Sequence, residues 1–218
     1  MQYLENSLIA LTMSGDTKIG SWYESTVENA PSFPRLEGES NVDVGVIGGG
    51  YTGLSTALHL AERGYQVGLL EAEHIAWGAS GRNGGQICSG QRQDMLALER
   101  LVPIEDARRL WHLGEEAKTL VRNRINQHNI SCDLRSGILT AAWKSSHQRF
   151  LARYIEHLKK HYDYGKTQLL DARDIRYHLA TSRYQGGFLD QGAGHLNPLK
   201  FALGLGQAAT EAGVAIYH

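Results

Sequence analysis

The sequence has few cysteines, no excess of one charge and no long apolar run. Its two cysteines, Cys88 and Cys132, form neither a CxxC pair nor the spacing of a metal site. This spacing argues against a disulfide scaffold and predicts free thiols in a reducing cytoplasm. We therefore expect a cytoplasmic location and no bound metal ion.

The charge balance and the hydropathy of the sequence indicate which classes of binding partner are not favoured. Lysine and arginine number 22 against 23 for aspartate and glutamate, so nothing favours a nucleic acid or an anionic membrane. No apolar run is long enough to span a bilayer. Glu5 stands where a signal peptide carries a basic residue, and the run at 8–11 is too short for its apolar core. We expect a globular protein that acts on a small molecule, without a transmembrane segment.

Residues 43–71 predict a strand, a glycine turn, a helix and a second strand. Apolar residues indicate short strands at 44–47 and 67–70, and helical spacing indicates a helix over 54–61. The turn between the first strand and the helix has the pattern G-x-G-x-x-G, formed by Gly48, Gly50 and Gly53. This order of elements is typical of a dinucleotide-binding βαβ unit.

Each part of that pattern has a physical role. Gly48 permits the tight turn, Gly50 lets the backbone approach a pyrophosphate, and Gly53 lets the helix pack closely on the strand. The helix N-terminus offers N–H groups and a partial positive charge to the phosphates. Glu71 ends the second strand, where a carboxylate can accept hydrogen bonds from ribose hydroxyls and would repel the 2′-phosphate of NADP. The alternative is a glycine-rich turn in another α/β protein, but strands, helix and acid together favour dinucleotide binding.

Outside this unit, the sequence predicts an N-terminal segment and an inserted segment of mixed helices and strands. Residues 1–40 lack clear periodicity, which indicates either an arm anchored by its aromatic residues or a disordered terminus. From about residue 95, amphipathic helices alternate with isolated strands, which favours an α+β insertion. One long helix presents an apolar face made of Leu110, Leu113, Ala117, Leu120, Val121 and Ile125.

Capping residues mark the helix boundaries of this insertion and of the segment that follows it. Ser145 or Ser146 is expected to cap a helix over 150–158, and Asp171 a shorter one. Asn197 and Pro198 then predict the start of a helix that ends at Gly213, followed by a strand over 214–217. Three recognisable parallel strands are few for such a sheet, so the sequence predicts a fold that is incomplete in this chain.

A second glycine-rich loop follows the first unit closely. Gly78-Ala-Ser-Gly-Arg-Asn-Gly-Gly-Gln86 contains four glycines, whose successive N–H groups can form an anion-binding nest. In a dinucleotide protein this loop lies beyond the second strand, beside the cofactor. The alternative is an ordinary flexible loop, since clustered glycines usually indicate one.

These motifs together resemble those of the FAD-dependent amine and amino-acid oxidoreductases, the relatives of D-amino-acid oxidase, glycine oxidase and sarcosine oxidase. The resemblance rests on Val46–Ser55, Leu70–Ala72 and the loop at 78–86. Residues 22–26, 190–195 and 196–199 also fit the gamma-glutamylputrescine oxidoreductase subgroup. The resemblance implies an α/β fold: a Rossmann-like FAD-binding domain with an inserted α+β substrate domain. The implied segments are an arm, the first FAD-binding segment, a partial substrate domain and a return to the FAD-binding domain, at 1–40, 41–92, 93–195 and 196–218.

The resemblance also implies which residues hold FAD. The pyrophosphate would be wrapped by Gly48, Gly50, Tyr51, Thr52 and Gly53, and the adenosine ribose held by Glu71. The path from the pyrophosphate to the ribityl chain would be lined by Ala79, Ser80, Gly81 and Arg82. The isoalloxazine would be reached by Asn83, Gly84, Gly85 and Gln86.

The implied activity is oxidation of a C–N bond in a small amine or amino acid such as gamma-glutamylputrescine. Hydride transfer to flavin gives an imine, which hydrolyses to an aldehyde or keto acid, and oxygen as acceptor gives hydrogen peroxide. No catalytic residue is identified; Arg82 is a weak candidate for a charge near the flavin or for contact with a substrate carboxylate, and a structural arginine is the alternative. The alternative functions are a glycine, sarcosine or D-amino-acid oxidase or dehydrogenase, and an inactive nucleotide-binding fragment.

Overall fold

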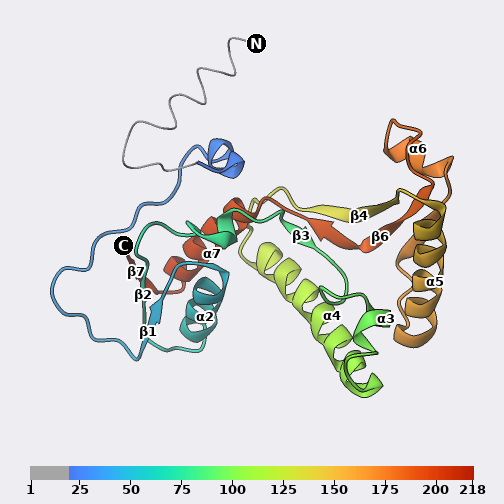
Figure 1. The fold of residues 1–218 in the computed structure, drawn as a ribbon. Coiled ribbons are helices and arrows are strands. Elements are labelled where there is room, and N and C mark those ends of the chain that lie inside the picture. The colour runs from blue at the N-terminus through green and yellow to red at the C-terminus, as the bar shows by residue number, and fades with distance from the viewer. Residues whose placement is uncertain (1–19) are drawn as a thin grey trace, which may run out of the picture. The chain divides into compact units, whose positions relative to one another are not determined.

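The computed structural model describes residues 20–218, so the features noted at Glu5 and at 8–11 lie outside the described residues. The chain forms two compact units (Figure 1). The described part of the first unit is residues 20–83 and 206–218, and the second unit is Gly84–Leu205. The domain boundaries expected after residues 92 and 195 stay a prediction.

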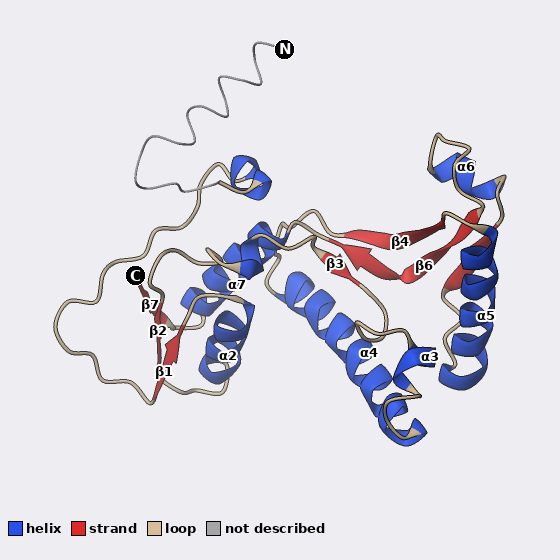
Figure 2. Cartoon of the chain, in the orientation of Figure 1, coloured by secondary structure: helices blue, strands red, loops and turns tan. Residues whose placement is uncertain are grey.

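The first unit contains a three-stranded parallel sheet in the order β1-β2-β7 (Figure 2). Its strands are β1 (Val44–Ile47), β2 (Val67–Leu70) and β7 (Ala215–Tyr217), and helix α2 (Tyr51–Ala61) connects the first two. In the register, Val44 pairs with Val67 and Gly68 pairs with Ala215. The predicted βαβ unit and the return strand are both confirmed.

The apolar spacing of α2 explains its burial. Leu54, Ala57 and Leu58 face the interior and are fully buried. The chain reverses after the helix at Gly64, whose φ of +89° is unstrained only for glycine. Burial of this one stripe leaves the opposite face of α2 in contact with solvent, as expected for an amphipathic surface helix.

The N-terminal segment of the first unit is tied down by polar contacts. A 3₁₀ helix, η1 (Trp22–Thr26), is capped by Ser21, whose hydroxyl accepts a hydrogen bond from the Glu24 N–H at 3.3 Å. Trp22 is 79% exposed, so the expected anchoring through aromatic residues does not apply to it. The chain then runs without regular structure to β1, and the His218 N–H donates to the Pro34 carbonyl.

The second unit is built on an antiparallel sheet of four strands (Figure 2). The strands are β3 (Gln86–Ile87), β4 (Arg135–Ala142), β5 (Thr167–Leu170) and β6 (Gly186–His195). Strand β6 is central: β4 pairs along one side, and β5 and β3 pair one after the other along the opposite side. The helices are α3 (Met95–Leu98), α4 (Ile104–Gln127), α5 (Ser145–Tyr162), α6 (Asp174–His178) and the start of α7 (Pro198–Glu211). An α+β arrangement is therefore confirmed.

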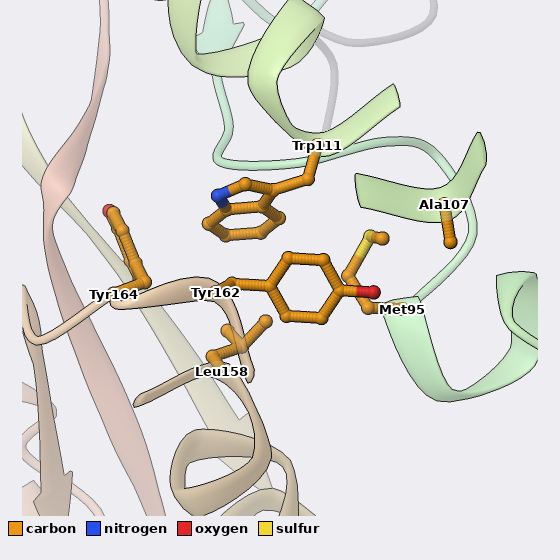
Figure 3. Packing of buried hydrophobic residues seen from close by; sticks show 6 residues of the cluster. All are labelled: Met95, Ala107, Trp111, Leu158, Tyr162 and Tyr164. Carbon is orange, nitrogen blue, oxygen red and sulfur yellow. The ribbon is translucent and has the colours of Figure 1, made fainter. Parts of the chain in front are cut away.

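An aromatic cluster forms part of the core of the second unit (Figure 3). The Trp111 ring lies 5.2 Å from that of Tyr162 and 5.1 Å from that of Tyr164, measured between centroids. Met95 and Leu158 fill the space beside these rings. The cluster joins α3, α4 and the C-terminal end of α5 through side-chain burial.

The predicted apolar face of α4 is only partly correct. Ile125 is buried, but Leu113 is 59% exposed and Leu120 is 44% exposed. The buried face instead contains Trp111 and Lys118. Helical periodicity predicts the buried face of a helix from its apolar residues. A buried lysine lies on that face without being apolar, so the periodicity does not indicate it.

The capping predictions have mixed outcomes. Helix α5 begins at Ser145 with Lys144 as N-cap, so neither predicted serine caps it through its side chain. Asp171 lies three residues before α6, and its Oδ1 accepts hydrogen bonds from the N–H groups of Arg173 and Asp174. Asn197 caps α7 as predicted, because its Oδ1 accepts from the Lys200 N–H at 3.1 Å.

The described helices include none that is both long and apolar enough to cross a bilayer. Both cysteines are free thiols: Cys132 is buried and Cys88 exposed. Burial raises the pKa of each thiol, and the neighbouring carboxylates of Asp190 at Cys88 and Asp133 at Cys132 raise it further.

Candidate cofactor site

The glycine turn of the first unit depends on missing side chains. Gly48 has a φ of +100°, and its N–H donates to the Leu70 carbonyl at 2.7 Å, which joins the turn to β2. A Cβ atom on Gly53 would overlap the Gly48 carbonyl oxygen and approach Val46 to 3.3 Å. The first turn of α2 can therefore pack against β1 only with glycine at position 53.

The N-terminus of α2 is arranged to receive negative charge. Its N-cap residue is Gly50, which has no side chain to cap the helix, and the first turn contains no acidic residue. The Tyr51 N–H donates to Ser80 Oγ at 3.0 Å, so an oxygen atom already lies at this positive end. A Cβ on Gly50 would lie 3.0 Å from the same hydroxyl.

Glu71 lies against the glycine turn although 22 residues separate it from Gly49. Its Oε2 accepts a hydrogen bond from the Gly49 N–H at 2.5 Å, and its Oε1 accepts from the Glu73 N–H at 3.0 Å. The Gly49 carbonyl in turn accepts from the Ala76 N–H at 3.0 Å. The carboxylate is thus fixed at the carboxyl end of β2, the edge at which parallel α/β sheets bind their ligands.

The first part of the second loop is closed by its own side chains. A 3₁₀ turn, η2 (Ala79–Gly81), is spanned by the Asn83 amide, which donates to the carbonyls of Ala79 and Ser80 at 3.1 and 3.0 Å. Arg82 Nε donates to the Trp77 carbonyl at 2.9 Å, and its guanidinium lies 4.8 Å from the centre of the Trp77 ring. The loop is therefore an ordered part of the first unit.

Arg82 also connects this loop to the N-terminal segment. Its NH2 atom lies 3.4 Å from Oε1 of Glu24, and both side chains are about one-third exposed. The hydrogen bond from Arg82 to the Trp77 carbonyl matches the structural role considered from the sequence. Its catalytic role stays a prediction.

The last three residues of the loop belong to the second unit. The Gly85 carbonyl accepts from the Leu196 N–H at 2.9 Å, and Gly85 has a φ of +66°. A Cβ at Gly85 would overlap the Leu196 carbonyl oxygen. Gln86 follows in β3 and pairs with His195. Close backbone packing thus determines the path of Gly84, Gly85 and Gln86.

Several predicted residues come together within the first unit. The glycine turn, Tyr51, Glu71 and Ser80 are joined by direct contacts, and Gly81 is buried in the loop that follows. Thr52 lies in the first turn of α2 with its side chain exposed. Sequence reasoning missed Gly49, which binds the Glu71 carboxylate through its N–H. The run of three consecutive glycines at 48–50 was the available signal.

A family model for FAD-dependent oxidoreductases, described as "DAO: FAD dependent oxidoreductase", matches residues 43–218. The chain belongs to this family. The match includes both β1 and β7 and covers the glycine turn, Glu71 and the second loop. The predicted fold class and the expectation of FAD as the family's cofactor are confirmed.

Curated relatives agree with this assignment. The chain is 38% identical over 198 residues to the "Probable oxidoreductase OrdL" of Rhizobium meliloti (strain 1021), covering 91% of this chain and 46% of that protein. It is 39% identical over 198 residues to the "Gamma-glutamylputrescine oxidoreductase" of Escherichia coli (strain K12), with the same two coverages. The chain spans about half the length of the curated relatives that it matches.

Solved structures support the fold. The L-amino acid deaminase from Proteus myxofaciens matches with a TM-score of 0.69 and 23% identity, over 87% of this chain and 40% of that one. Glycine oxidase from Bacillus cereus ATCC 14579 matches with a TM-score of 0.61 and 21% identity, over 82% and 47%. At these identities the likeness establishes the fold alone.

The residues present fit FAD. A glycine N-cap, a first helical turn without acids and a carboxylate fixed at the end of β2 are the features that a pyrophosphate and a ribose require. The described residues contain no cluster of three or more histidine, cysteine, aspartate or glutamate side chains that could hold a metal ion.

Proposed function

We propose that this chain binds FAD through its first unit and provides part of an oxidoreductase that oxidises a C–N bond of a small amine or amino acid. The observation that carries the proposal is the contact between the glycine turn and Glu71, formed on the fold of the FAD-dependent oxidoreductase family. Gamma-glutamylputrescine and related amines are the proposed substrate class, because a relative at 39% identity bears that name.

Glu71 would bind the adenosine ribose. Its carboxylate already accepts the N–H groups of Gly49 and Glu73, which fixes its orientation without using all of its acceptor capacity. Two ribose hydroxyls can donate to the remaining lone pairs. Because a charged acceptor makes stronger hydrogen bonds than a neutral one, this residue contributes more than a neutral amide would.

The N-terminus of α2 would bind the pyrophosphate. Gly50 leaves the backbone open to close approach, and the helix dipole favours negative charge at that end. The Ser80 hydroxyl lies at the same end, where it accepts the Tyr51 N–H and retains a proton to donate to a phosphate oxygen. Thr52, Ala79 and Gly81 are proposed to line the cofactor beside these groups.

The residues that follow would position the reactive part of the cofactor. Asn83 holds the Ala79–Gly81 turn closed, and Gly84, Gly85 and Gln86 would lie along the isoalloxazine. When bound, FAD supplies the two-electron oxidation of the C–N bond. This chain would bind and orient the cofactor and exclude water from it.

Oxygen or another acceptor is proposed to take up the electrons, with hydrogen peroxide as the product of oxygen. A glycine, sarcosine or D-amino-acid oxidase or dehydrogenase is the second candidate, because glycine oxidase has the same fold. Gamma-glutamylputrescine differs from these substrates in its long chain and its γ-glutamyl group. A comparison of which amine reduces the flavin therefore separates the two proposals.

A flavin-bleaching screen tests the proposed function. The purified chain is loaded with FAD without oxygen and mixed in turn with gamma-glutamylputrescine, glycine, sarcosine and D-alanine. Loss of the oxidised flavin absorbance with gamma-glutamylputrescine alone supports the first candidate, and loss with glycine or sarcosine supports the second. A chain that binds FAD but reacts with none of these amines supports instead the nucleotide-binding fragment considered from the sequence.

A further inference from the structure

The second unit contains buried charges that the proposed FAD contacts do not use. Lys118 of α4 is 5% exposed and Asp190 of β6 is 7% exposed. A buried ammonium is costly unless it is paired and fully hydrogen-bonded. The hydrogen-bond and ion-pair partners of Lys118 and Asp190 therefore indicate which parts of the chain these two side chains hold together.

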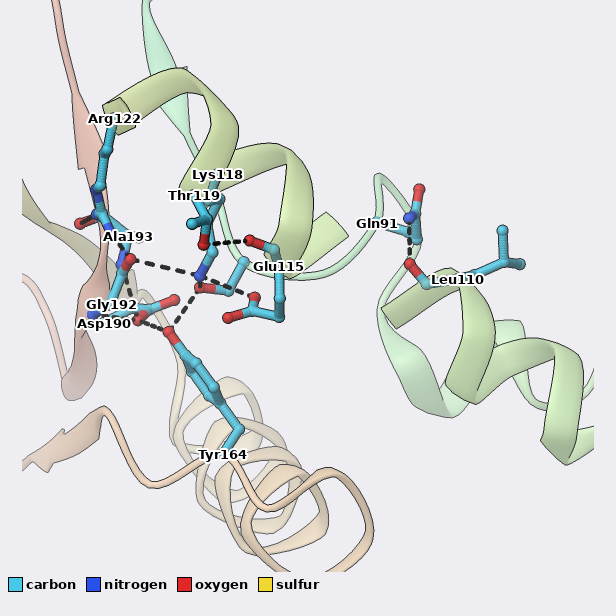
Figure 4. Close-up of polar contacts among 11 residues, drawn as sticks. Gln91, Leu110, Glu115, Lys118, Thr119, Arg122, Tyr164, Asp190, Gly192 and Ala193 are labelled. Carbon is cyan, nitrogen blue, oxygen red and sulfur yellow. Dashed lines mark hydrogen bonds and ion pairs between the residues drawn. The ribbon is translucent and has the colours of Figure 1, made fainter. Parts of the chain in front are cut away.

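Lys118 contacts three different segments (Figure 4). Its Nζ lies 2.8 Å from Oε1 of Glu115 as an ion pair, donates to Ser89 Oγ at 2.7 Å and approaches the Gly192 carbonyl at 3.4 Å. It also lies 5.1 Å from the centre of the Tyr164 ring. The ammonium thus links α4 with the segment after β3 and with β6.

Asp190 completes the same network (Figure 4). Its Oδ1 accepts the Tyr164 hydroxyl at 2.5 Å and the N–H groups of Gly192 and Ala193 at 3.0 and 3.2 Å. The Tyr164 hydroxyl is also 2.7 Å from Ser89 Oγ. A continuous chain of polar contacts therefore runs from α4 through Ser89 and Tyr164 to the backbone of β6.

This network lies at residues 191–193 of β6, where the pairing with β3 and β5 is interrupted and the pairing with β4 shifts register. Strand β5 pairs with β6 as far as Asp190, and β3 pairs only with Gly194 and His195. In between, Arg122 NH2 donates to the carbonyls of Gly192 and Ala193 at 2.8 and 3.1 Å. Side chains of α4 and Asp190 thus supply donors and acceptors where the strand pairing is interrupted.

Strand β3 needs such support because it has only two residues. Its pairs are Gln86 with His195 and Ile87 with Gly194, and so short a pairing is weak by itself. The Leu196 N–H holds it from the Gly85 side, and the hydroxyl of Ser89 holds it from the other end. Within this network, Ser89 is the residue after Ile87 whose hydrogen bonds connect the chain to Lys118 and Tyr164, and through them to β6.

We propose that Lys118 is a positioning residue that fixes β3, and with it Gly85 and Gln86, through Ser89 and the interrupted side of β6. The consequence for flavin rests on the proposed function, in which these two residues lie along the isoalloxazine. The consequence for β3 itself does not, so the two can be tested separately.

Hydrogen–deuterium exchange of the whole chain tests the structural part. In Lys118→Met we expect the amides of residues 87–90 to exchange about tenfold faster or more, while the β4–β6 pairs keep their protection. Lys118→Arg keeps a cation and is expected to restore most of the protection. Lys200→Met is the matched control, because Lys200 forms an ion pair of the same 2.8 Å length with Asp133, but at the surface.

Ser89→Ala keeps the test decisive if Lys118→Met does not fold. This variant removes the hydroxyl that joins Lys118 to Tyr164, but it leaves the ion pair of Lys118 with Glu115 and the hydrogen bonds of Asp190 in place, so faster exchange is expected at residues 87–90 alone. The proposal is overturned if residues 87–90 exchange in Ser89→Ala at the wild-type rate. It is also overturned if they exchange no faster in Lys118→Met than in the control Lys200→Met.

The flavin spectrum tests the functional part. Lys118→Met loaded with FAD is expected to show a changed visible band shape, with the wild-type shape restored in Lys118→Arg and unchanged in Lys200→Met. An unchanged spectrum in Lys118→Met, with β3 loosened, removes the link to flavin. A wild-type chain that binds no FAD contradicts the proposed function instead, and the exchange data still decide whether Lys118 fixes β3.

Discussion

The two units of this chain achieve close packing in opposite ways. In the first unit, helix and strand approach through glycines, since a Cβ on Gly53 would overlap the Gly48 carbonyl. In the second unit, large side chains fill the space, with the Trp111 ring tilted against Tyr162 and edge-on to Tyr164. The first arrangement keeps side chains out of the turn, so that a ligand can approach its backbone closely, and the second fills the interior with large buried side chains. The comparison teaches that ligand binding and core packing make different demands on sequence.

The largest expected effect is that of Gly53→Val in the first unit. The added side chain would overlap backbone that cannot move without separating α2 from β1, so a loss of about 4 kcal/mol or more is expected. Hydrogen exchange resolved by unit should show lost protection in α2 and β1, with the second unit protected as in the wild type. Gly45→Ala is the control, because no atom lies within 4 Å of a Cβ at that position. Wild-type protection of α2 in Gly53→Val would contradict the close-packing account.

Trp111→Ala is the corresponding test of the second unit. Removing a 2% exposed indole leaves a cavity among Met95, Tyr162 and Tyr164, which should cost about 3–5 kcal/mol. Urea unfolding followed by near-ultraviolet circular dichroism measures this loss. Trp22→Ala, which truncates a 79% exposed side chain, should stay within about 0.5 kcal/mol of the wild type. Equal losses in the two variants would show that the cluster is not a stabilising core.

High pH should weaken the second unit through its tyrosines. Burial raises the pKa of Tyr154 to about 12. Burial also raises the pKa of Tyr162 and Tyr164, and the hydrogen bonds that Tyr162 makes to Glu99 and Tyr164 to Asp190 raise it further. A raised folded-state pKa means that the unfolded chain loses these protons first. Stability is therefore complete below pH 10 and falls as the pH rises towards 12.

Tyrosinate absorbance and unfolding midpoints between those pH values check this expectation. Tyr154→Phe should flatten the pH dependence of unfolding, because one of the shifted groups is gone. Ionisation of all the tyrosines at the ordinary pKa, with no loss of stability above it, would contradict the prediction.

The smallest effect is expected for Glu24→Gln. The variant removes an ion pair with Arg82 in which both side chains are about one-third exposed, and which is worth less than about 1 kcal/mol. Limited proteolysis should nonetheless cut faster around η1, because Glu24 joins this turn to the second loop. Asp133→Asn removes a comparable surface pair in the second unit and should leave that cleavage rate unchanged. Equal cleavage rates in Glu24→Gln and the wild type would show that the pair does not hold the segment.

The first unit could be predicted from the sequence because its signals are local. The glycines at 48, 50 and 53, the spacing of α2 and the acid after β2 together predict a βαβ unit, and the structure agrees with their placement. The contact between Gly49 and Glu71 could not be predicted, because it depends on how the turn and the strand end meet in space.

The second unit was harder to predict because its determinants are non-local. Lys118 lies inside only because Glu115, Ser89 and Gly192 meet there, and no periodicity of α4 indicates this. The same burial explains why Leu113 and Leu120 are exposed against expectation. Ser145 or Ser146 was expected to cap α5 from its residue type, yet the N-cap position is occupied by Lys144, whose side chain makes no capping hydrogen bond.

The central claim is that the glycine turn and Glu71 form an FAD site. The most direct measurement is a titration of the 218-residue chain with FAD, followed by the fluorescence of the flavin, for the wild type, Glu71→Ala and Gly50→Val. The account predicts saturable binding to the wild type, binding weakened by about 1.5–3 kcal/mol in Glu71→Ala, and none in Gly50→Val. Binding of FAD by a folded Gly50→Val chain with wild-type affinity, or no binding by a folded wild-type chain, would contradict it.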